Sequence, residues 1–381
     1  MNKGLNMGDR LKAYEGDEWI YLMIFNRLTN YTPAQKLQLY ERFGDASRVF
    51  SHRSEAESIF QKPFLIDGDE FSAEELFGDA ERELESCRKR GIQVVSINSE
   101  LYPERLRNIN DPPLLIFALG NLELLGVEQA VSIVGARRAS NRSITLAYTI
   151  ARDLSRAGFV VVSGLAYGID CYAHRGALEG QGSTIAVLGN GIDVVYPRSN
   201  YNLYNAIRER GLLISEFPLG TPPLKYNFPK RNRIISGLSR GTIVVEASVK
   251  SGALITAGYA MDQGREVMAL PGGAGSEHFA GNNSLIKQGA HLVEDACDIA
   301  TIMGVNWEIV ERKNKKLHFS PLECNILKVI GDDMVSIEEI GRALDSAISV
   351  IASSLTMLEL KGVVVQHPGK IYSRVYEYGE E

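Results

Sequence analysis

The strongest constraint on the fold is a regular alternation that begins near residue 92. Nine short apolar runs, most of them rich in Val, Ile and Leu, are separated by polar or amphipathic stretches. The runs read IQVVSI, LLIFALG, VSIVGA, FVVVSG, TIAVLG, LLISE, TIVVEA, EVMALPG and HLVED. Apolar strands that alternate with helices of about 10–15 residues are typical of a parallel sheet covered on both faces. We therefore predict a doubly wound α/β domain over residues 91–305.

Two smaller modules are predicted on either side of this domain. Residues 1–90 have helical patterns, including a capping box that opens at Thr32 with the sequence TPAQ. Residues 306–319 are rich in charge and predict a linker. Residues 320–381 predict three helices followed by the strands VVVQ and KIYSRV, which is the order of a winged helix. Its third helix carries a single base, Lys361, so we expect this helix to contact protein rather than to read duplex DNA.

Composition narrows the class of protein. The formal net charge of −6 argues against a protein that coats nucleic acid over its whole surface, although it leaves room for a local basic groove. The four cysteines are scattered without metal-ligand spacing, so no zinc site and no metal is expected. No apolar run is long enough to cross a membrane, and we expect a cytoplasmic protein without membrane insertion.

Ligands of open α/β sheets bind beyond the carboxyl ends of the strands. After the run SIVGA the chain offers Arg137, whose planar guanidinium suits phosphate oxygens, instead of the G-x-G-x-x-G of dinucleotide sites. Small and polar residues of the neighbouring loops are expected to support a phosphate groove: Gly135, Ser163, Gly164, Ser251, Gly252 and Asn283. Asp170 and His174 share a helix face, but helix capping by Asp170 is favoured over acid–base catalysis.

The stretch from Lys225 to Arg240 has five bases and no acid in a chain that is acidic overall. Because the residue before a proline avoids the α region, we expect Phe228 to lie in an extended segment and a helix to begin near Asn232. Such a stretch suits an unpaired strand of nucleic acid. Its cations can contact the phosphates, and its aromatic rings can stack on the bases. The residues expected to do so are Lys225, Phe228, Lys230, Arg231, Asn232 and Arg233.

The stretch LPGGAGSEHF keeps an enzymatic alternative open. Its glycines resemble the PGG-x-G-T motif of the phosphoribohydrolase (lysine-decarboxylase-like) family, which continues to a catalytic glutamate three residues after the threonine. Here Phe279 stands at that position and Glu277 comes two residues too early. No other catalytic set is present, so no catalytic residue and no cofactor is predicted. A nucleotide-processing enzyme and a nucleotide sensor without catalysis remain as alternatives.

The order of motifs resembles the bacterial DNA-processing protein A (DprA/Smf) family. The likeness rests on SIVGARRAS, VVSGLAYGID, VVYPRSN, LKYNFPKRNRIISGLSRGTIVVEA and GNNSLIKQGAHLV. It implies an extended Rossmann-like core, an N-terminal module similar to a sterile-alpha-motif-like or helix-hairpin-helix domain, and a winged-helix tail.

The resemblance also implies a function. Members bind single-stranded DNA, protect it during natural transformation and DNA uptake, and load a RecA-type recombinase; they act as homodimers and are not enzymes. A single-strand-binding protein is a further expected partner. By position, Arg137, Lys225, Phe228 and the RNR motif (231–233) match the family's DNA contacts, and Lys230 matches more loosely. Ala136 replaces the serine that is usual in the first motif.

Overall fold

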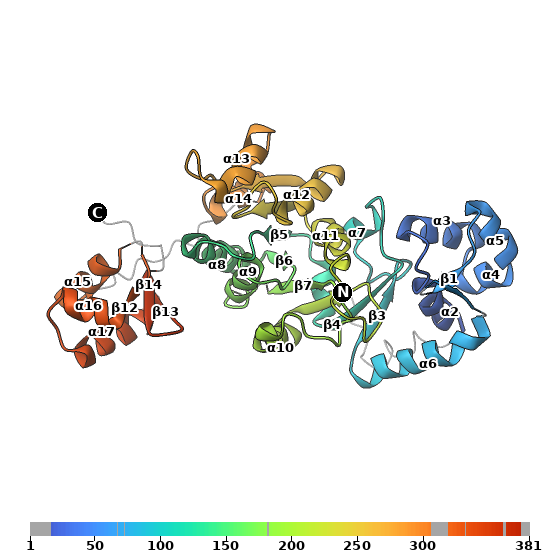
Figure 1. Cartoon of the computed structure of the whole chain (residues 1–381), viewed down its shortest axis with the longest axis horizontal. Coiled ribbons are helices and arrows are strands. Elements are labelled where there is room, and N and C mark those ends of the chain that lie inside the picture. The colour runs from blue at the N-terminus through green and yellow to red at the C-terminus, as the bar shows by residue number, and fades with distance from the viewer. Residues whose placement is uncertain are drawn as a thin grey trace, which may run out of the picture.

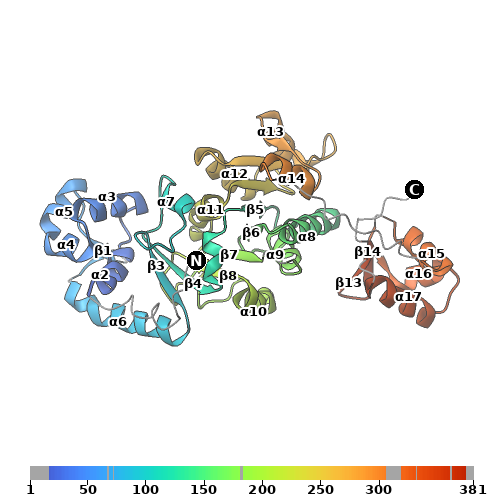
Figure 2. The ribbon, with the colours of Figure 1, turned by 180° about the vertical axis from the view of Figure 1, so that it is seen from behind.

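The computed structural model describes residues 17–66, 68–71, 73–180, 183–305, 319–331, 333–360 and 363–374. Figure 1 and its reverse view, Figure 2, show a central α/β core between a helical N-terminal module and a small C-terminal module. All nine predicted runs enter one nine-stranded sheet of order β11-β10-β9-β5-β6-β7-β8-β4-β3. The predicted doubly wound α/β class is confirmed.

The sheet is parallel over most of its width. Its strands are β3 (Gln93–Ser96), β4 (Leu115–Gly120), β5 (Ala130–Val134), β6 (Val160–Ser163), β7 (Thr184–Leu188), β8 (Leu212–Ser215), β9 (Gly241–Val244), β10 (Glu266–Ala269) and β11 (His291–Leu292). Strands β5 to β11 pair in parallel, whereas β4 and β3 add an antiparallel edge. The strand order reverses direction between β5 and β9, which is where such sheets bind ligands.

Helices cover both faces of the sheet. They are α7 (Glu104–Arg107), α8 (Asn141–Arg156), α9 (Ile169–Ala177), α10 (Tyr201–Arg210), α11 (Asn227–Gly237), α12 (Ala253–Asp262), α13 (Ala280–Lys287) and α14 (Ala296–Ile302). Apolar side chains of α8, α9 and α14 pack with one face of β5, β6 and β9. Those of α11 and α12 belong to the cluster on the other face. Strands β5 to β9 are therefore buried at every position, as their continuous apolar runs predict, whereas the edge strand β11 is exposed.

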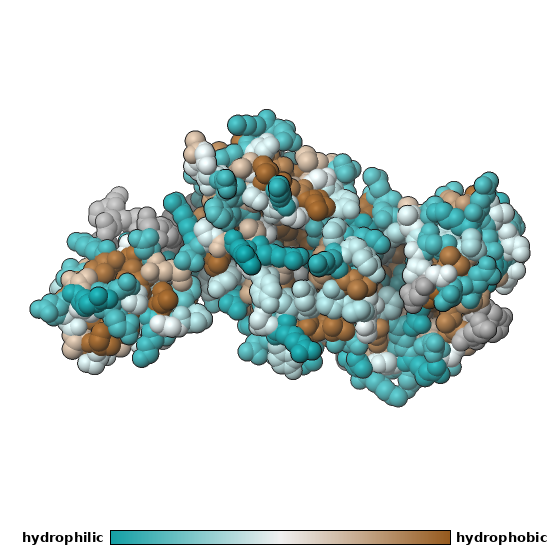
Figure 3. Space-filling model, viewed as in Figure 1, coloured by the Kyte–Doolittle hydropathy of each residue, from teal (hydrophilic) through white to brown (hydrophobic). Residues whose placement is uncertain are grey.

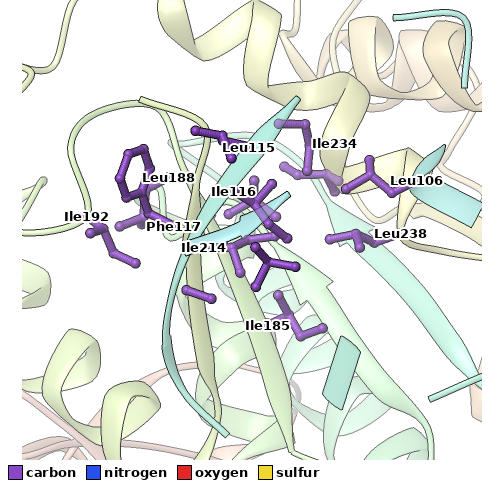
Figure 4. Close-up of a cluster of buried hydrophobic side chains, with 14 of the residues drawn as sticks. Leu106, Leu115, Ile116, Phe117, Ile185, Leu188, Ile192, Ile214, Ile234 and Leu238 are labelled. Atoms are coloured by element: carbon purple, nitrogen blue, oxygen red, sulfur yellow. The ribbon is translucent and has the colours of Figure 1, made fainter. Parts of the chain in front are cut away.

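Helix α11 is anchored by its apolar side chains. Ile234 and Leu238 lie among Leu106, Leu115 and Ile116 in the cluster drawn in Figure 4, and all five are at most 5% exposed. Burial of a side chain such as Ile or Leu contributes about 1.5–3 kcal/mol. This packing fixes one face of α11, the helix that carries most of the basic stretch. The opposite face of α11 lies at the carboxyl edge of the sheet.

The N-terminal module consists of α2 (Asp17–Asn26), α3 (Pro33–Phe43), α4 (Ala46–Ser51), α5 (Arg53–Phe60), the hairpin of β1 (Leu65–Ile66) and β2 (Asp69–Glu70), and α6 (Ala73–Lys89). The capping box predicted at Thr32 is present, with Gln35 as its partner. Phe25, Phe50 and Phe64 form edge-on and tilted ring contacts in its core. Its assignment to a sterile-alpha-motif-like or helix-hairpin-helix class stays a prediction.

The C-terminal module has the predicted winged-helix order. It comprises α15 (Pro321–Ile330), β12 (Val335–Ser336), α16 (Ile337–Ala343), α17 (Ile348–Leu360), β13 (Val364–His367) and β14 (Ile371–Arg374). It has a hydrophobic core of its own, which includes Ile326, Ile340 and Leu355. Residues 306–318 of the predicted linker lie outside the described residues, and only Phe319 of the linker is described. Lys361 also lies outside the described residues.

In the described parts of the chain, no helix is long and apolar enough to cross a bilayer.

Candidate nucleic-acid interface

A cavity of about 590 Å³ opens where the strand order reverses. Its walls come from the loop after β5, the loop after β9, the start of α12 and the exposed side of α11. Figure 3 shows hydrophilic side chains across the middle of the core, between the lobe of α12–α14 and the part that carries α9 and α10. The predicted carboxyl-edge position of the site thus coincides with a real hollow in the molecule.

Arg137 and Phe228 meet at this cavity although 91 residues separate them. The guanidinium carbon of Arg137 lies 5.6 Å from the centroid of the Phe228 ring, which is a cation–π contact. Arg137 is exposed and Phe228 is half-buried, so both reach solvent. The ring of Tyr196 packs against Phe228 at 5.5 Å between centroids. The arrangement offers an aromatic face beside a positive charge.

The local backbone at Phe228 differs from the sequence prediction. Helix α11 begins at Asn227, five residues before the expected start at Asn232, and Phe228 is helical rather than extended. Pro229 is tolerated because it occupies the first turn, where backbone N–H groups have no intrahelical acceptor. The preference of a pre-proline residue for extended backbone is outweighed here. As a consequence, Phe228 and Asn232 lie one helical turn apart and both line the cavity.

Arg231 forms part of the buried floor of the cavity, and its side chain does not extend into the open space. It is only 3% exposed, and its Nη1 donates to the carbonyl oxygens of Gly164, at 2.8 Å, and of Val187. Its Nε donates to Asn232 Oδ1 at 3.2 Å. Burial lowers the pKa of the guanidinium to about 10, and nearby Asp170 counteracts this shift. Arg231 remains charged at neutral pH and places positive potential in the floor of the cavity.

Arg233 does not line the cavity, contrary to the expectation that it faces phosphate. Its side chain is 5% exposed and donates to both carboxylate oxygens of Glu216, at 2.9 and 2.6 Å. Its Nε donates to the carbonyl oxygen of Asp111 at 2.8 Å. The basic stretch therefore has a compensating acid, supplied by Glu216 just after β8.

The remaining predicted contacts divide into two groups. Lys225 and Asn232 line the cavity, and Lys225 is exposed. Lys230 is exposed but lies outside the lining, with its Nζ 5.4 Å from the ring centroid of Tyr226. Asn232 and Lys230 both lie on α11, and Lys225 lies just before it. This segment thus supplies two residues of the cavity lining and one basic residue outside it.

The predicted supporting residues also divide. Gly135, Ser251 and Gly252 line the cavity. A Cβ on Gly135 would lie 2.5 Å from a side-chain carbon of Ile169, so this close approach requires glycine. The other three support loops without lining the cavity: the Ser163 hydroxyl donates to Ile133 O, Gly164 O accepts from Arg231, and Asn283 exchanges two hydrogen bonds with the backbone of Gly272.

Glu246 is a cavity residue that the sequence interpretation missed. Its carboxylate is fully buried and accepts from the backbone N–H and the hydroxyl of Ser140, at 3.0 and 2.6 Å. Its carbonyl oxygen accepts from Ala136 N at 2.7 Å. Glu246 therefore ties the loop after β9 to the loop that carries Arg137. Its place one residue beyond the run TIVV, at the carboxyl edge, was the signal that could have identified it.

Asp170 and His174 are structural. Asp170 accepts from Gly164 N at 3.1 Å, so it braces the preceding loop rather than capping α9, whose N-cap is Gly168. His174 is wholly buried; its Nε2 accepts from Leu165 N, and Nδ1 lies 2.8 Å from Thr184 Oγ1. Burial lowers its pKa to about 3. A neutral imidazole with both nitrogens engaged is unsuited to proton transfer with a ligand.

The LPGGAG loop has no carboxylate at the position where the phosphoribohydrolase motif needs one. Phe279 stands there and packs against Gly272, where a Cβ would lie 2.1 Å from Phe279 carbons. Glu277 lines the cavity as an exposed side chain. Within the described ranges no group of three or more His, Cys, Asp and Glu residues is arranged to hold a metal ion.

The fold and the cavity together define a doubly wound α/β protein with a cationic, aromatic groove at the switch point of its sheet. Comparison with known families identifies it further. The family described as DNA recombination-mediator protein A matches residues 93–304, and the DprA winged helix domain matches residues 315–370. The chain belongs to the DNA recombination-mediator protein A family, as its resemblance to DprA/Smf proteins predicted.

Individual relatives agree with this assignment. The chain is 38% identical to Protein Smf of Escherichia coli over 286 residues, which cover 72% of this chain and 76% of that protein. It is 45% identical to DNA processing protein DprA of Streptococcus pneumoniae over 204 residues, or 54% and 72% of the two chains.

Two solved structures are similar in fold. The X-ray structure of DprA from S. pneumoniae superposes with a TM-score of 0.59 at 35% identity, covering 74% of this chain and 97% of that one. The Helicobacter pylori protein, described for its single-stranded DNA binding mode, gives a TM-score of 0.51 at 29% identity over 55% and 95% of the chains.

Proposed function

We propose that the protein binds single-stranded DNA in the groove at the switch point of its sheet. The observation that carries the proposal is the guanidinium of Arg137 held 5.6 Å from the Phe228 ring. A strand crossing the groove places a phosphate at Arg137 and Lys225 and stacks a base on Phe228. Such base–aromatic stacking contributes about 1–3 kcal/mol per base and tolerates any sequence.

An unpaired strand fits this groove better than a duplex does. A ring that lines a cavity can be reached by a base only when that base has left its own stack, which costs a duplex its pairing. The H. pylori relative is described as a single-stranded DNA binder, which supports the same choice. The described part of α17 carries no Lys or Arg, so the winged helix offers no basic third helix for the major groove.

The groove is proposed to hold DNA without cleaving it. We propose further that the protein delivers the bound strand to a RecA-type recombinase during natural transformation and recombination, in the cytoplasm and as a homodimer. A single-strand-binding protein would be the competitor that it displaces from the strand. The support for these partners is the family's description as a recombination mediator.

A salt titration of oligonucleotide binding tests the central claim. Labelled (dT)20, the matching duplex and mononucleotides are compared by fluorescence anisotropy and thermal shift on the full chain and on residues 1–305. We expect the tightest binding to (dT)20, a linear fall of log K with log salt, and equal affinity for both chains. Binding of mononucleotides alone would favour the sensor alternative. Release of free base or shortened strands would favour an enzyme.

A further inference from the structure

In the described parts of the chain, exposed aromatic side chains lie along one edge of the core. Among all Phe, Tyr and Trp residues that the structure describes, four are exposed: Tyr167 at 50%, Tyr196 at 39%, Tyr201 at 57% and Tyr226 at 60%. All four lie on segments at the carboxyl edge of the parallel strands, beside the groove. Single exposed apolar residues are ordinary, but a group confined to one edge indicates an interaction surface.

Three of these tyrosines extend the groove sideways along the sheet. Tyr167 lies in the loop between β6 and α9, and Tyr196 and Tyr201 lie between β7 and the first turn of α10. Strands β6 and β7 follow β5 in the sheet, so the strands that lead into these loops lie about 5 and about 10 Å from the strand that leads to Arg137. We refer to Tyr167, Tyr196 and Tyr201 as the tyrosine rim.

Buried contacts hold the two rim loops together. Asn200 is 4% exposed, and its Nδ2 donates to the carbonyl oxygen of Leu165 at 3.1 Å. Leu165 is two residues from Tyr167, and Asn200 is adjacent to Tyr201. The tyrosines are therefore presented by loops that are fixed to each other at their base.

The rim is continuous with the groove. Tyr196 packs on Phe228 with ring centroids 5.5 Å apart and planes inclined by 41°. On the other side, Ala166 lines the cavity next to Tyr167. A strand whose base stacks on Phe228 therefore has Tyr196 as its next aromatic surface, and the loops beyond it present Tyr201 and Tyr167.

We propose that the tyrosine rim is a second segment of the single-strand path, which stacks the bases that follow the one held at Phe228. This inference rests on the proposed function and assigns residues to it outside the cavity. The rim segments 164–168 and 194–202 contain one base and no acid, so they do not repel phosphate. A protein partner would explain the exposure of the tyrosines, but not the direct contact of one of them with the ring at the groove.

The test measures affinity as a function of strand length. Full-length wild type and the variant Tyr167→Ser/Tyr201→Ser are titrated with (dT)4, (dT)8, (dT)12 and (dT)20 at one salt concentration. Neither of these side chains is part of the cavity lining. We expect unchanged affinity for (dT)4 and a loss of about tenfold or more for (dT)12 and (dT)20, because each stacked base contributes about 1–3 kcal/mol. An oligonucleotide with the same backbone but abasic beyond its first four residues should bind both proteins equally.

Two outcomes would contradict the proposed role of the tyrosine rim. Equal losses on (dT)4 and (dT)20 would mean that the tyrosines support the cavity, and no loss on any length would mean that the strand leaves in another direction. Met357→Ala is the matched control, since it removes a side chain that is 50% exposed but lies on α17, away from the edge. Arg137→Ala separates this test from that of the proposed function, because it should weaken (dT)4 and (dT)20 alike.

Discussion

Arg231 and Arg233 stand two residues apart on α11 and serve opposite sides of that helix. The guanidinium of Arg231 bonds the carbonyl oxygen of Gly164 beneath the groove, whereas that of Arg233 bonds the carboxylate of Glu216 behind it. Two residues along an α-helix correspond to about 200° of rotation. One of the two neighbouring arginines therefore shapes the ligand site, and the other attaches the helix to the core.

Replacing Arg233 should cost stability rather than a DNA contact. Arg233→Met leaves the Glu216 side chain, 11% exposed, without its charged partner. Removing one member of a buried ion pair costs about 3–5 kcal/mol. Chemical denaturation should therefore show a lower free energy of unfolding, and Arg233→Met/Glu216→Met should recover most of it. The salt dependence of (dT)20 binding should match that of wild type; a loss of one unit of slope would place Arg233 on a phosphate.

Substitutions of Arg137 and of Phe228 should both weaken DNA binding, but they should change its salt dependence differently. Arg137→Gln should weaken (dT)20 binding and reduce the slope of log K against log salt by about one, because one phosphate contact is lost. Phe228→Leu should weaken binding by about 1–3 kcal/mol at an unchanged slope, because stacking releases no counterions. Anisotropy titrations between low and moderate salt measure both quantities. Identical changes of slope in the two variants would contradict the division of roles.

The sequence predicted the architecture well because strand burial is a local property. A run such as VVVS, buried on both faces in β6, carries its own signal, and the rule that ligands bind at carboxyl ends places the groove. Arg137, Lys225, Phe228 and Asn232 could be assigned to the cavity on these grounds.

What the sequence did not reveal depends on distant partners. Nothing in the RNR motif indicates that Arg233 pairs with Glu216, 17 residues earlier, while Arg231 turns toward Gly164, 67 residues earlier. The role of Glu246 likewise depends on Ser140, 106 residues away. The helical conformation of Phe228 was missed because the preference of a single dipeptide is weaker than the packing of a whole helix.

His174 should make the protein sensitive to acid. Burial lowers its pKa from 6.5 to about 3, so the unfolded state binds a proton between these values and the folded state does not. The stability from this residue is complete above pH 6.5 and is lost as the pH falls toward 3, by roughly 2 kcal/mol at pH 5. Urea denaturation at pH 7 and pH 5 measures the loss. In His174→Gln the loss over this range should be smaller by that amount, although the variant is less stable at pH 7.

Lys36 should produce the same trend, a stability that rises with pH, in a higher pH range. It lies on α3 and is 7% exposed, with its Nζ donating to Asn26 O at 2.7 Å. Burial lowers its pKa from 10.5 to about 7, with Lys230 and Arg233 adding to the effect and Glu216 and Asp111 opposing it. Between pH 7 and 10.5 the unfolded chain therefore holds the proton more tightly than the folded protein.

Stability should accordingly rise with pH in this window, by roughly 2 kcal/mol between pH 7 and pH 9 from Lys36 alone. The measurement is urea denaturation at several pH values in that range. Lys36→Met should flatten the rise, because no proton is then released on folding. Lys287→Met removes an exposed lysine from α13 and should leave the rise intact. A rise of the same size in Lys36→Met would show that other groups cause it and that Lys36 is not held in its neutral form.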